Sequence, residues 1–175
     1  MAGIARLVRL LVAVLPLVVA DGPAARAEEK ALQEPSGLDT ACDWLAGAPR
    51  DTQRPRGLAG VESSLIDLAP AQKACDEAVA QYPNVARFHY QAGRVAYAQG
   101  DYARAFKLFS KAAELGHSLS MTAICGQYYS GRGVPENRLQ AEEWCEKAAV
   151  AGDPTGMATR AYLYLLRVAH DDNLS

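Results

Sequence analysis

The residues best suited to chemistry in this 175-residue chain are its three histidines and four cysteines. His89, His117 and His170 are far apart in the sequence, and none stands in an H-E-x-x-H or H-x-H pattern. Those two patterns, with closely spaced histidines, are typical of zinc sites. The cysteines form no C-x-x-C redox motif, and no cysteine and histidine have zinc-like spacing. We therefore predict no metal site and no cofactor.

Other patterns of catalytic chemistry are equally weak. The sequence has no G-x-S-x-G nucleophile elbow, no P-loop and no S-x-x-K motif. Gly131 and Gly133 form only a fragment of a phosphate-binding loop, and turn geometry accounts for both. Glu142, Glu143 and Glu146 share a helix face, but a solvated surface is the better interpretation because no histidine accompanies them. We expect no catalytic residue.

Residues 1–27 have the pattern of a secretory signal peptide. Arg6 and Arg9 precede an apolar run of 11 residues at 10–20, and the A-x-A sequence at 25–27 is a signal peptidase site. A helix of that length spans roughly 16 Å, about half of the ~30 Å hydrocarbon core of a membrane. A cleaved signal peptide is therefore favoured over an uncleaved membrane anchor.

Cleavage there would leave residues 28–175 and would change the net charge from −2 to −4. We expect this mature protein in the bacterial periplasm or outside the cell, without membrane insertion. It has no long basic run, which argues against a nucleic-acid partner. In an oxidising compartment, an even number of cysteines indicates two disulfides among Cys42, Cys75, Cys125 and Cys145. The alternative is that Cys125 and Cys145 stay reduced and pack as small apolar residues.

The mature chain contains an internal repeat of small, large and small residues. The offsets of four and three residues place the members of each set on one helix face. The small residues let a neighbouring helix approach, and the larger one fills the space between the helices. The three sets, 34 and 36 residues apart, are Ala71, Cys75 and Ala78; Ala105, Phe109 and Ala112; and Ala141, Cys145 and Ala148. Paired helices are therefore the predicted building unit.

Each of the last two sets follows another predicted helix, at residues 86–99 and 120–130. Gly116 and Gly152 come after the sets and are typical helix stops. After the second stop, Asp-Pro opens a further predicted helix at 155–169. This last helix lacks a predicted partner, as a capping element would.

The segment before the repeats, residues 28–68, is less regular. Its first ten residues are expected to be disordered. A short helix is predicted at 40–46, then a long loop rich in glycine, proline and arginine at 47–60, then the second helix of an incomplete first unit at 66–82. At the other end of the chain, residues 170–175 are predicted to form a polar, flexible tail.

Several polar side chains near these elements need an interpretation. Arg50, Arg54 and Arg56 lie in the long loop and are candidates for a binding element, but a solvated connector is favoured because exposed arginine is common at surfaces. His117 follows a helix stop and is expected at the surface. His89 is expected to be packed and hydrogen-bonded at the core-facing start of a helix.

Two segments resemble known repeat families. Gly93 to Ala113, GRVAYAQGDYARAFKLFSKAA, is similar to a tetratricopeptide repeat. Tyr128 to Asp153, YYSGRGVPENRLQAEEWCEKAAVAGD, is similar to a SEL-one-like repeat, with the GxGVP loop, Trp144 and the KAA-x2-G ending of that family. The resemblance covers about residues 69–169. It implies an all-α fold, a short right-handed α-solenoid of antiparallel helix pairs whose concave groove is lined by the first helix of each pair.

The repeat register motivates one disulfide pairing. Cys75 and Cys145 occupy the same repeat position on second helices, and Cys42 and Cys125 lie on the preceding helices. Pairing Cys42 with Cys75 and Cys125 with Cys145 would join the two helices of each unit. Closing loops of about 34 and 21 residues would stabilise the fold by roughly 3–4 kcal/mol each.

Aligning the helices by Gly93, Cys125 and Ala161 predicts which side chains face the groove. Tyrosine and arginine predominate among them, and both are typical interface anchors. The predicted groove residues are Arg87, Tyr90, Gln91, Arg94, Tyr97, Thr122, Tyr129 and Tyr162. Arg87 and Arg94 could bind a carboxylate of a peptide. The alternative is that all eight are ordinary exposed residues on one helix face.

The resemblance also implies a function. Proteins with these repeats are adaptors, in bacterial envelopes and elsewhere, so we expect an exported scaffold that binds a protein or peptide partner rather than an enzyme. One alternative is a binder of cell-wall (peptidoglycan) peptides with β-lactamase-like or other hydrolytic activity, because some cysteine-rich family members carry a β-lactamase label. Another is a purely structural homo-oligomer.

Overall fold

The computed structural model describes residues 38–171, which belong to one compact unit of the chain, residues 32–175. The predicted signal peptide at 1–27 and the disorder predicted for 28–37 lie outside the described residues, as does the end of the predicted tail.

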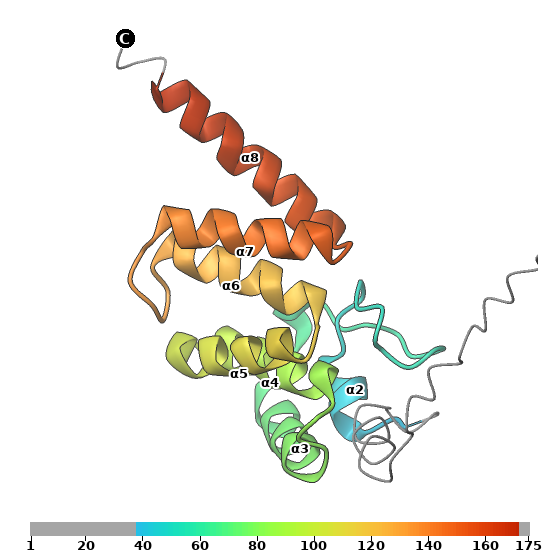
Figure 1. The fold of residues 1–175 in the computed structure, drawn as a ribbon. Helices are drawn as coiled ribbons and strands as arrows, with labels where there is room; N and C mark the ends of the chain where they lie inside the picture. The colour runs from blue at the N-terminus through green and yellow to red at the C-terminus, as the bar shows by residue number, and fades with distance from the viewer. Residues whose placement is uncertain (1–37, 172–175) are drawn as a thin grey trace, which may run out of the picture. The chain divides into compact units, whose positions relative to one another are not determined.

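Every regular element among residues 38–171 is a helix, so the predicted all-α class is confirmed. A short helix is followed, after a long loop, by a single 3-10 turn, and six longer helices then complete the stack (Figure 1). In chain order the elements are α2 (Ala41–Ala46), η1 (Ser63–Leu65), α3 (Leu68–Gln81), α4 (Ala86–Ala98), α5 (Tyr102–Glu114), α6 (Ser118–Ser130), α7 (Arg138–Val150) and α8 (Pro154–Asp171).

Polar side chains determine where three of these helices begin. Asp101 Oδ1 accepts a hydrogen bond from the Arg104 amide at 3.1 Å at the start of α5. Asn137 Oδ1 accepts one from the Gln140 amide at 3.1 Å at the start of α7. The Asp153 carboxylate accepts hydrogen bonds from two amides of the first turn of α8, at 3.0 and 3.2 Å. Each cap satisfies amides that have no partner within the helix.

The predicted stops end α5 and α7. Gly116 and Gly152 follow these helices with φ angles of 85° and 83°, a region in which a side chain would be strained. The last helix, α8, has no glycine or proline after Gly156, and it continues through Asp171. It therefore includes the first two residues of the predicted tail.

The helices pack through the faces that the sequence repeats. All nine residues of the three small-large-small sets are at most 3% exposed. Consecutive helices from α3 to α8 contact each other, and in addition α2 packs against α4 and α6 against α8. The chain therefore forms a helical-repeat solenoid in which the repeated faces make the core (Figure 1).

Each disulfide joins two helices of one unit. Cys42–Cys75 links α2 to α3 with a Cα–Cα distance of 4.6 Å, and Cys125–Cys145 links α6 to α7 at 5.4 Å. These are the pairs that the repeat register predicts. The alternative in which Cys125 and Cys145 stay reduced does not hold in the structure.

Candidate functional site

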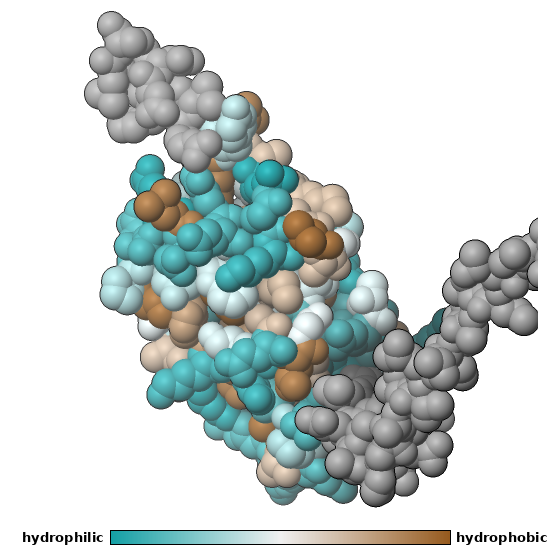
Figure 2. Space-filling view, in the orientation of Figure 1, coloured by the Kyte–Doolittle hydropathy of each residue, from teal (hydrophilic) through white to brown (hydrophobic). Residues whose placement is uncertain are grey.

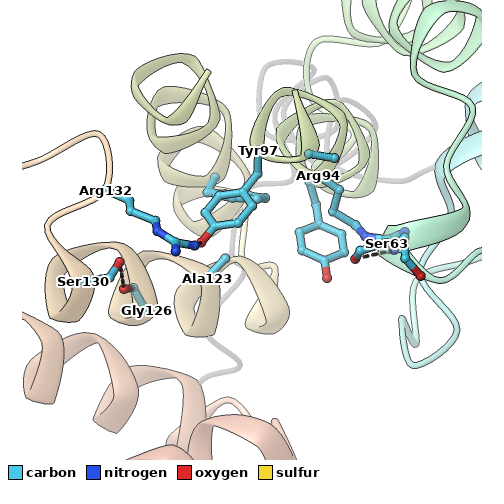
Figure 3. Close-up of a pocket in the computed structure, with 11 residues that line it drawn as sticks. Ser63, Arg94, Tyr97, Ala123, Gly126, Ser130 and Arg132 are labelled. Atoms are coloured by element: carbon cyan, nitrogen blue, oxygen red, sulfur yellow. Dashed lines mark hydrogen bonds between the residues drawn. The ribbon is translucent and has the colours of Figure 1, made fainter. Parts of the chain in front are cut away.

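A hollow of about 740 Å³ lies between α4 and α6, and we call it the central groove (Figure 3). The side chains of α4 and α6 that line it occupy equivalent faces of the two first helices. They are Tyr90, Arg94, Tyr97 and the terminal Ala98 from α4, and Ala123, Gly126 and Ser130 from α6. Large polar residues thus form one side of the groove, and small residues form the other.

Arg94 closes one end of the central groove together with η1. Its guanidinium donates hydrogen bonds to the Ala46 carbonyl at 2.6 Å, the Val61 carbonyl at 2.7 Å and Ser63 Oγ at 3.1 Å. Arg94 is 8% exposed, and this burial lowers the pKa of its guanidinium. Most of its donors are therefore used to attach the N-terminal segment to α4.

Arg132 stands at the other end, in the loop between α6 and α7 (Figure 3). Its Nη1 donates to the Tyr97 hydroxyl at 2.9 Å, and its guanidinium lies 5.4 Å from the centroid of the Tyr102 ring. The hydrogen bond with Tyr97 raises the pKa of the Arg132 guanidinium. This arginine is exposed, so it presents a permanent positive charge at the surface of the groove.

Tyr90 lies at the centre of the α4 side and is 9% exposed. Its ring stacks on the His117 ring with centroids 4.4 Å apart and packs against Phe109 at 5.8 Å. Burial raises the pKa of Tyr90 to about 12, and the nearby Arg94 charge opposes this shift only in part. The phenol is therefore neutral at ordinary pH, and it can serve as a hydrogen-bond donor toward a ligand.

A second hollow of about 390 Å³ adjoins the central groove and shares Tyr90, Arg94 and Ala123 with it. Thr122, one of the predicted groove residues, lines this second hollow and donates a hydrogen bond to Asp153. Four of the predicted groove residues therefore lie beside accessible space: Tyr90, Arg94, Tyr97 and Thr122.

Two other predicted groove residues, Arg87 and Gln91, do not face open space. Both are at most 1% exposed, because α2 covers them. Arg87 Nε and Gln91 Nε2 donate to Asp43 Oδ1 of α2 at 3.0 and 2.9 Å, and Arg87 also donates to the Leu38 carbonyl at 2.8 Å. The prediction that Arg87 and Gln91 face an open groove is therefore wrong, because the N-terminal segment of the same chain fills the concave face at these two positions.

The remaining two predicted residues lie away from the central groove. Tyr129 packs against the cluster around the Cys125–Cys145 disulfide, which includes Leu163. Tyr162 is 56% exposed on α8 and lines none of the hollows described here. Tyr162 therefore does not extend the groove wall as the alignment predicted, although Thr155 at the start of α8 lines the second hollow.

His117 is buried, which contradicts its predicted surface position. It is 1% exposed because the long loop folds over it, and its Nε2 lies 3.2 Å from Asp51 Oδ1 of that loop. His117 Nδ1 accepts a hydrogen bond from the Ser120 amide at 3.3 Å and lies 3.1 Å from Ser120 Oγ. Aspartate, histidine and serine thus lie in a row, but Asp51 is at Nε2 and Ser120 at Nδ1, the reverse of a hydrolase triad, and the Ser120 hydroxyl is buried. This arrangement fixes the loop and the start of α6.

The long loop differs in part from the solvated connector favoured from its composition, because Asp51 and Ala48 are buried while Arg50 and Arg56 are exposed. Arg54 donates a hydrogen bond to the Ala48 carbonyl, and Val61 N donates to the Gly47 carbonyl at 2.7 Å. Arg50 lines the second hollow, whereas Arg56 is exposed and lines neither hollow. His89 is buried and hydrogen-bonded, as predicted.

Sequence reasoning missed eight of the eleven residues that line the central groove. Five of them lie on α4, α5 and α6: Ala98, Phe109, Ala123, Gly126 and Ser130. The other three are Ser63, Ser64 and Arg132. All three lie outside the first helices to which the alignment applies. A sequence signal existed only for Arg132. This arginine stands between Gly131 and Gly133, and the turn at these glycines places its side chain beside Tyr97 of α4.

No helix within residues 38–171 is long and apolar enough to cross a membrane, and no group of three metal-binding side chains converges there. Hydrophilic side chains cover much of the face in Figure 2, with hydrophobic residues scattered between them.

Comparison with protein families assigns the central part of the chain. The Sel1 repeat model matches residues 84–117, which contain α4 and α5, and residues 118–153, which contain α6 and α7. A search of curated proteins finds no match. Sel1 repeats generally mediate protein–protein interactions and are typically non-catalytic. The chain thus contains two consecutive Sel1 repeats, the family that the GxGVP loop and the KAA-x2-G ending predicted.

Proposed function

We propose that this protein is exported to the periplasm or the cell exterior and binds a peptide or protein partner in the central groove. In this proposal residues 1–27 are a signal peptide, residues 28–68 are an N-terminal segment with a short helix and a loop, residues 69–169 form the repeat scaffold and residues 170–175 are the tail. The general role of Sel1 repeats in protein–protein interaction supports the binding function. The signal-like sequence and the two disulfides support an oxidising compartment.

The observation that carries the proposal is the shape and lining of the central groove. Its volume of about 740 Å³ is within the range of roughly 300–1,000 Å³ that is usual for ligand sites. Tyr90, Tyr97 and Arg94 are residue types that dominate binding energy at protein interfaces. On the opposite side, a Cβ added at Gly126 would meet no atom within 4 Å, so the space above α6 is open to an incoming backbone.

The decisive experiment fills this space. A Gly126→Trp substitution places an indole in the groove, while Gly126→Ala adds only a methyl group and serves as the matched control. A photo-crosslinking amino acid is placed at Ala98, which lines the groove, and in a parallel protein at Lys107, which is exposed on α5 and lines neither hollow. Both reporters are expressed in the full chain, and crosslinked partners are identified by mass spectrometry.

We expect one partner that crosslinks from position 98 and not from position 107. Gly126→Trp should abolish this crosslink, and Gly126→Ala should preserve it. Equal crosslinking from both positions, or a crosslink that survives Gly126→Trp in a folded protein, would show that partners bind elsewhere. Circular dichroism of each variant verifies folding.

Export is tested separately by intact-mass analysis of protein from cell fractions. We expect a mature N-terminus at Glu28 in the envelope or the medium, with Cys42–Cys75 and Cys125–Cys145 peptides in a non-reducing digest. A cytoplasmic protein that retains Met1 and has four free thiols would contradict the proposal of export.

A further inference from the structure

We propose that the partner segment in the central groove carries a carboxylate and that Arg132 binds it. This inference rests on the proposed function and specifies the chemistry of the ligand. The site consists of the Arg132 guanidinium, the Tyr97 hydroxyl beside it and the open surface of α6 around Gly126 (Figure 3).

The charge of the central groove differs from that of the whole chain. Among the eleven residues that line the groove there are two arginines and neither aspartate nor glutamate. The chain as a whole has a net charge of −2. A positive hollow in an acidic protein favours anionic groups and disfavours basic ones.

The two arginines differ in their capacity to bind a ligand. Arg94 is buried, and its guanidinium hydrogen bonds go to two carbonyls and a serine hydroxyl of the N-terminal segment. Arg132 is exposed, and its hydrogen bond to the Tyr97 hydroxyl engages only Nη1. A guanidinium has five N–H donors, so Arg132 can bind a carboxylate through two parallel hydrogen bonds while it keeps Tyr97.

The position of Arg132 is fixed before a ligand arrives. The Arg132 amide donates to the Gln127 carbonyl at 3.2 Å, and Gln127 Nε2 donates to the Arg132 carbonyl at 3.0 Å. Gln127 is 1% exposed and also donates to the Tyr102 carbonyl at 2.9 Å, which attaches the loop to α5. These contacts hold the backbone of the loop, and the hydrogen bond to Tyr97 positions the guanidinium, so less conformational entropy is lost when Arg132 binds an anion.

The concave face already binds a carboxylate within this chain. In the preceding part of the stack, Asp43 receives hydrogen bonds from Arg87 and Gln91 of α4. The central groove offers another cation, Arg132 of the loop that follows α6, and the chain supplies no acidic residue to the lining there. The volume of the groove greatly exceeds that of a free carboxylate ion, so the occupant that fits it is a peptide segment whose backbone lies over Ala123 and Gly126.

The test uses protein purified from cells that express the full chain, with matched libraries of fluorescent nonapeptides as probes. One library contains Asp and Glu at randomised positions with an amidated C-terminus. The second contains Asn and Gln at the same positions and is also amidated, and the third is identical to the second but has a free C-terminal carboxylate. Binding is measured by fluorescence anisotropy and by sequencing of the retained peptides.

We expect the first or the third library to bind, and the uncharged amidated library to bind at least tenfold more weakly. Arg132→Ala should weaken binding of the preferred peptide by about 10- to 100-fold, as is usual for a lost hydrogen bond to a charged group. Arg132→Lys should restore only part of the affinity, because an ammonium does not make the bidentate contact. Arg138→Ala, which removes an exposed arginine outside the groove that pairs with Glu136, should leave binding unchanged.

The outcomes separate this inference from the proposed function. If all three libraries bind equally and Arg132→Ala binds as wild type, the inference of a carboxylate ligand is wrong and groove binding stands. If no library binds wild type more tightly than it binds the Gly126→Trp variant, groove binding of peptides is itself refuted. Preference for the first library over the third identifies a side-chain carboxylate, and the reverse identifies a C-terminal one; either supports the inference.

Discussion

The concave faces of α4 and α6 occupy equivalent positions in consecutive repeats but have opposite roles. In the alignment of Gly93 with Cys125, Gln91 and Arg94 of α4 correspond to Ala123 and Gly126 of α6. The α4 residues are buried and bind the N-terminal segment, whereas the α6 residues line an open groove. At these two positions the first repeat therefore holds the N-terminal segment of its own chain, and the second leaves its surface open. The rest of the α4 face is shared, because Tyr90 and Tyr97 line the central groove as well.

Ion pairs give a second comparison, between the buried α4 face and the outer surface of the stack. The Arg87–Asp43 ion pair beside α2 is at most 1% exposed on either side chain. The ion pair between Arg104 and Asp76, on the outer surface of the stack, has side chains 33% and 45% exposed. A buried pair that loses one partner leaves a charge in a poor solvent, whereas an exposed charge is hydrated by water. The predictions below use this contrast to test which interactions hold the structure together.

The largest effects are expected from the disulfides. The Cys42→Ala/Cys75→Ala and Cys125→Ala/Cys145→Ala double variants each open one crosslink, with sequence separations of 33 and 20 residues. Loop entropy predicts a loss of about 3–4 kcal/mol in the free energy of unfolding for each variant. Urea denaturation measures both losses. A variant as stable as wild type would mean that the corresponding bond is not formed in the native protein.

The next largest effect is expected from Asp43→Asn. This change removes the charge of Asp43 while Arg87 remains buried, so we expect a loss of about 3 kcal/mol in the free energy of unfolding. The matched change on the exposed pair, Asp76→Asn, should cost less than about 1 kcal/mol. Equal costs for the two variants, measured in the same urea titration, would contradict the assignment of α2 as an integral part of the core.

The repeat pattern predicted the scaffold because it is local. The small-large-small sets gave the buried faces, and their register gave both disulfide pairs. The repeat pattern could not predict which residues pack against the α4 face. Asp43 and Asp51 lie 44 and 66 residues from their partners, Arg87 and His117, in a segment that has no repeat pattern. Burial of these polar groups depends on that long-range packing, which helix periodicity does not encode.

A moderate effect is expected where a glycine packed against the paired helix is compared with a glycine on the open face of α6. A Cβ at Gly93 would lie 2.5 Å from Phe109 Cε1, so Gly93→Ala should lower the free energy of unfolding by about 1–3 kcal/mol. At Gly126 a Cβ meets nothing within 4 Å, and alanine should raise stability by up to about 1 kcal/mol through its helix propensity. Thermal denaturation of both variants should therefore show shifts of opposite sign. Shifts of the same sign would contradict the contrast between a closed and an open helix face.

The smallest effect concerns Tyr90, whose buried phenol belongs to the α4 face. Burial raises its pKa from 10.0 to about 12, so between these values the folded protein retains a proton that the unfolded chain has lost. Stability must then fall as pH rises through this window. Relative to Tyr90→Phe, which lacks the ionisable group, wild type should lose about 1 kcal/mol of unfolding free energy between about pH 9 and pH 11. The other tyrosines titrate in both proteins and cancel in this difference, so equal pH dependence of the two proteins would show that Tyr90 is hydrated and that the α4 side of the groove is as open as the α6 side.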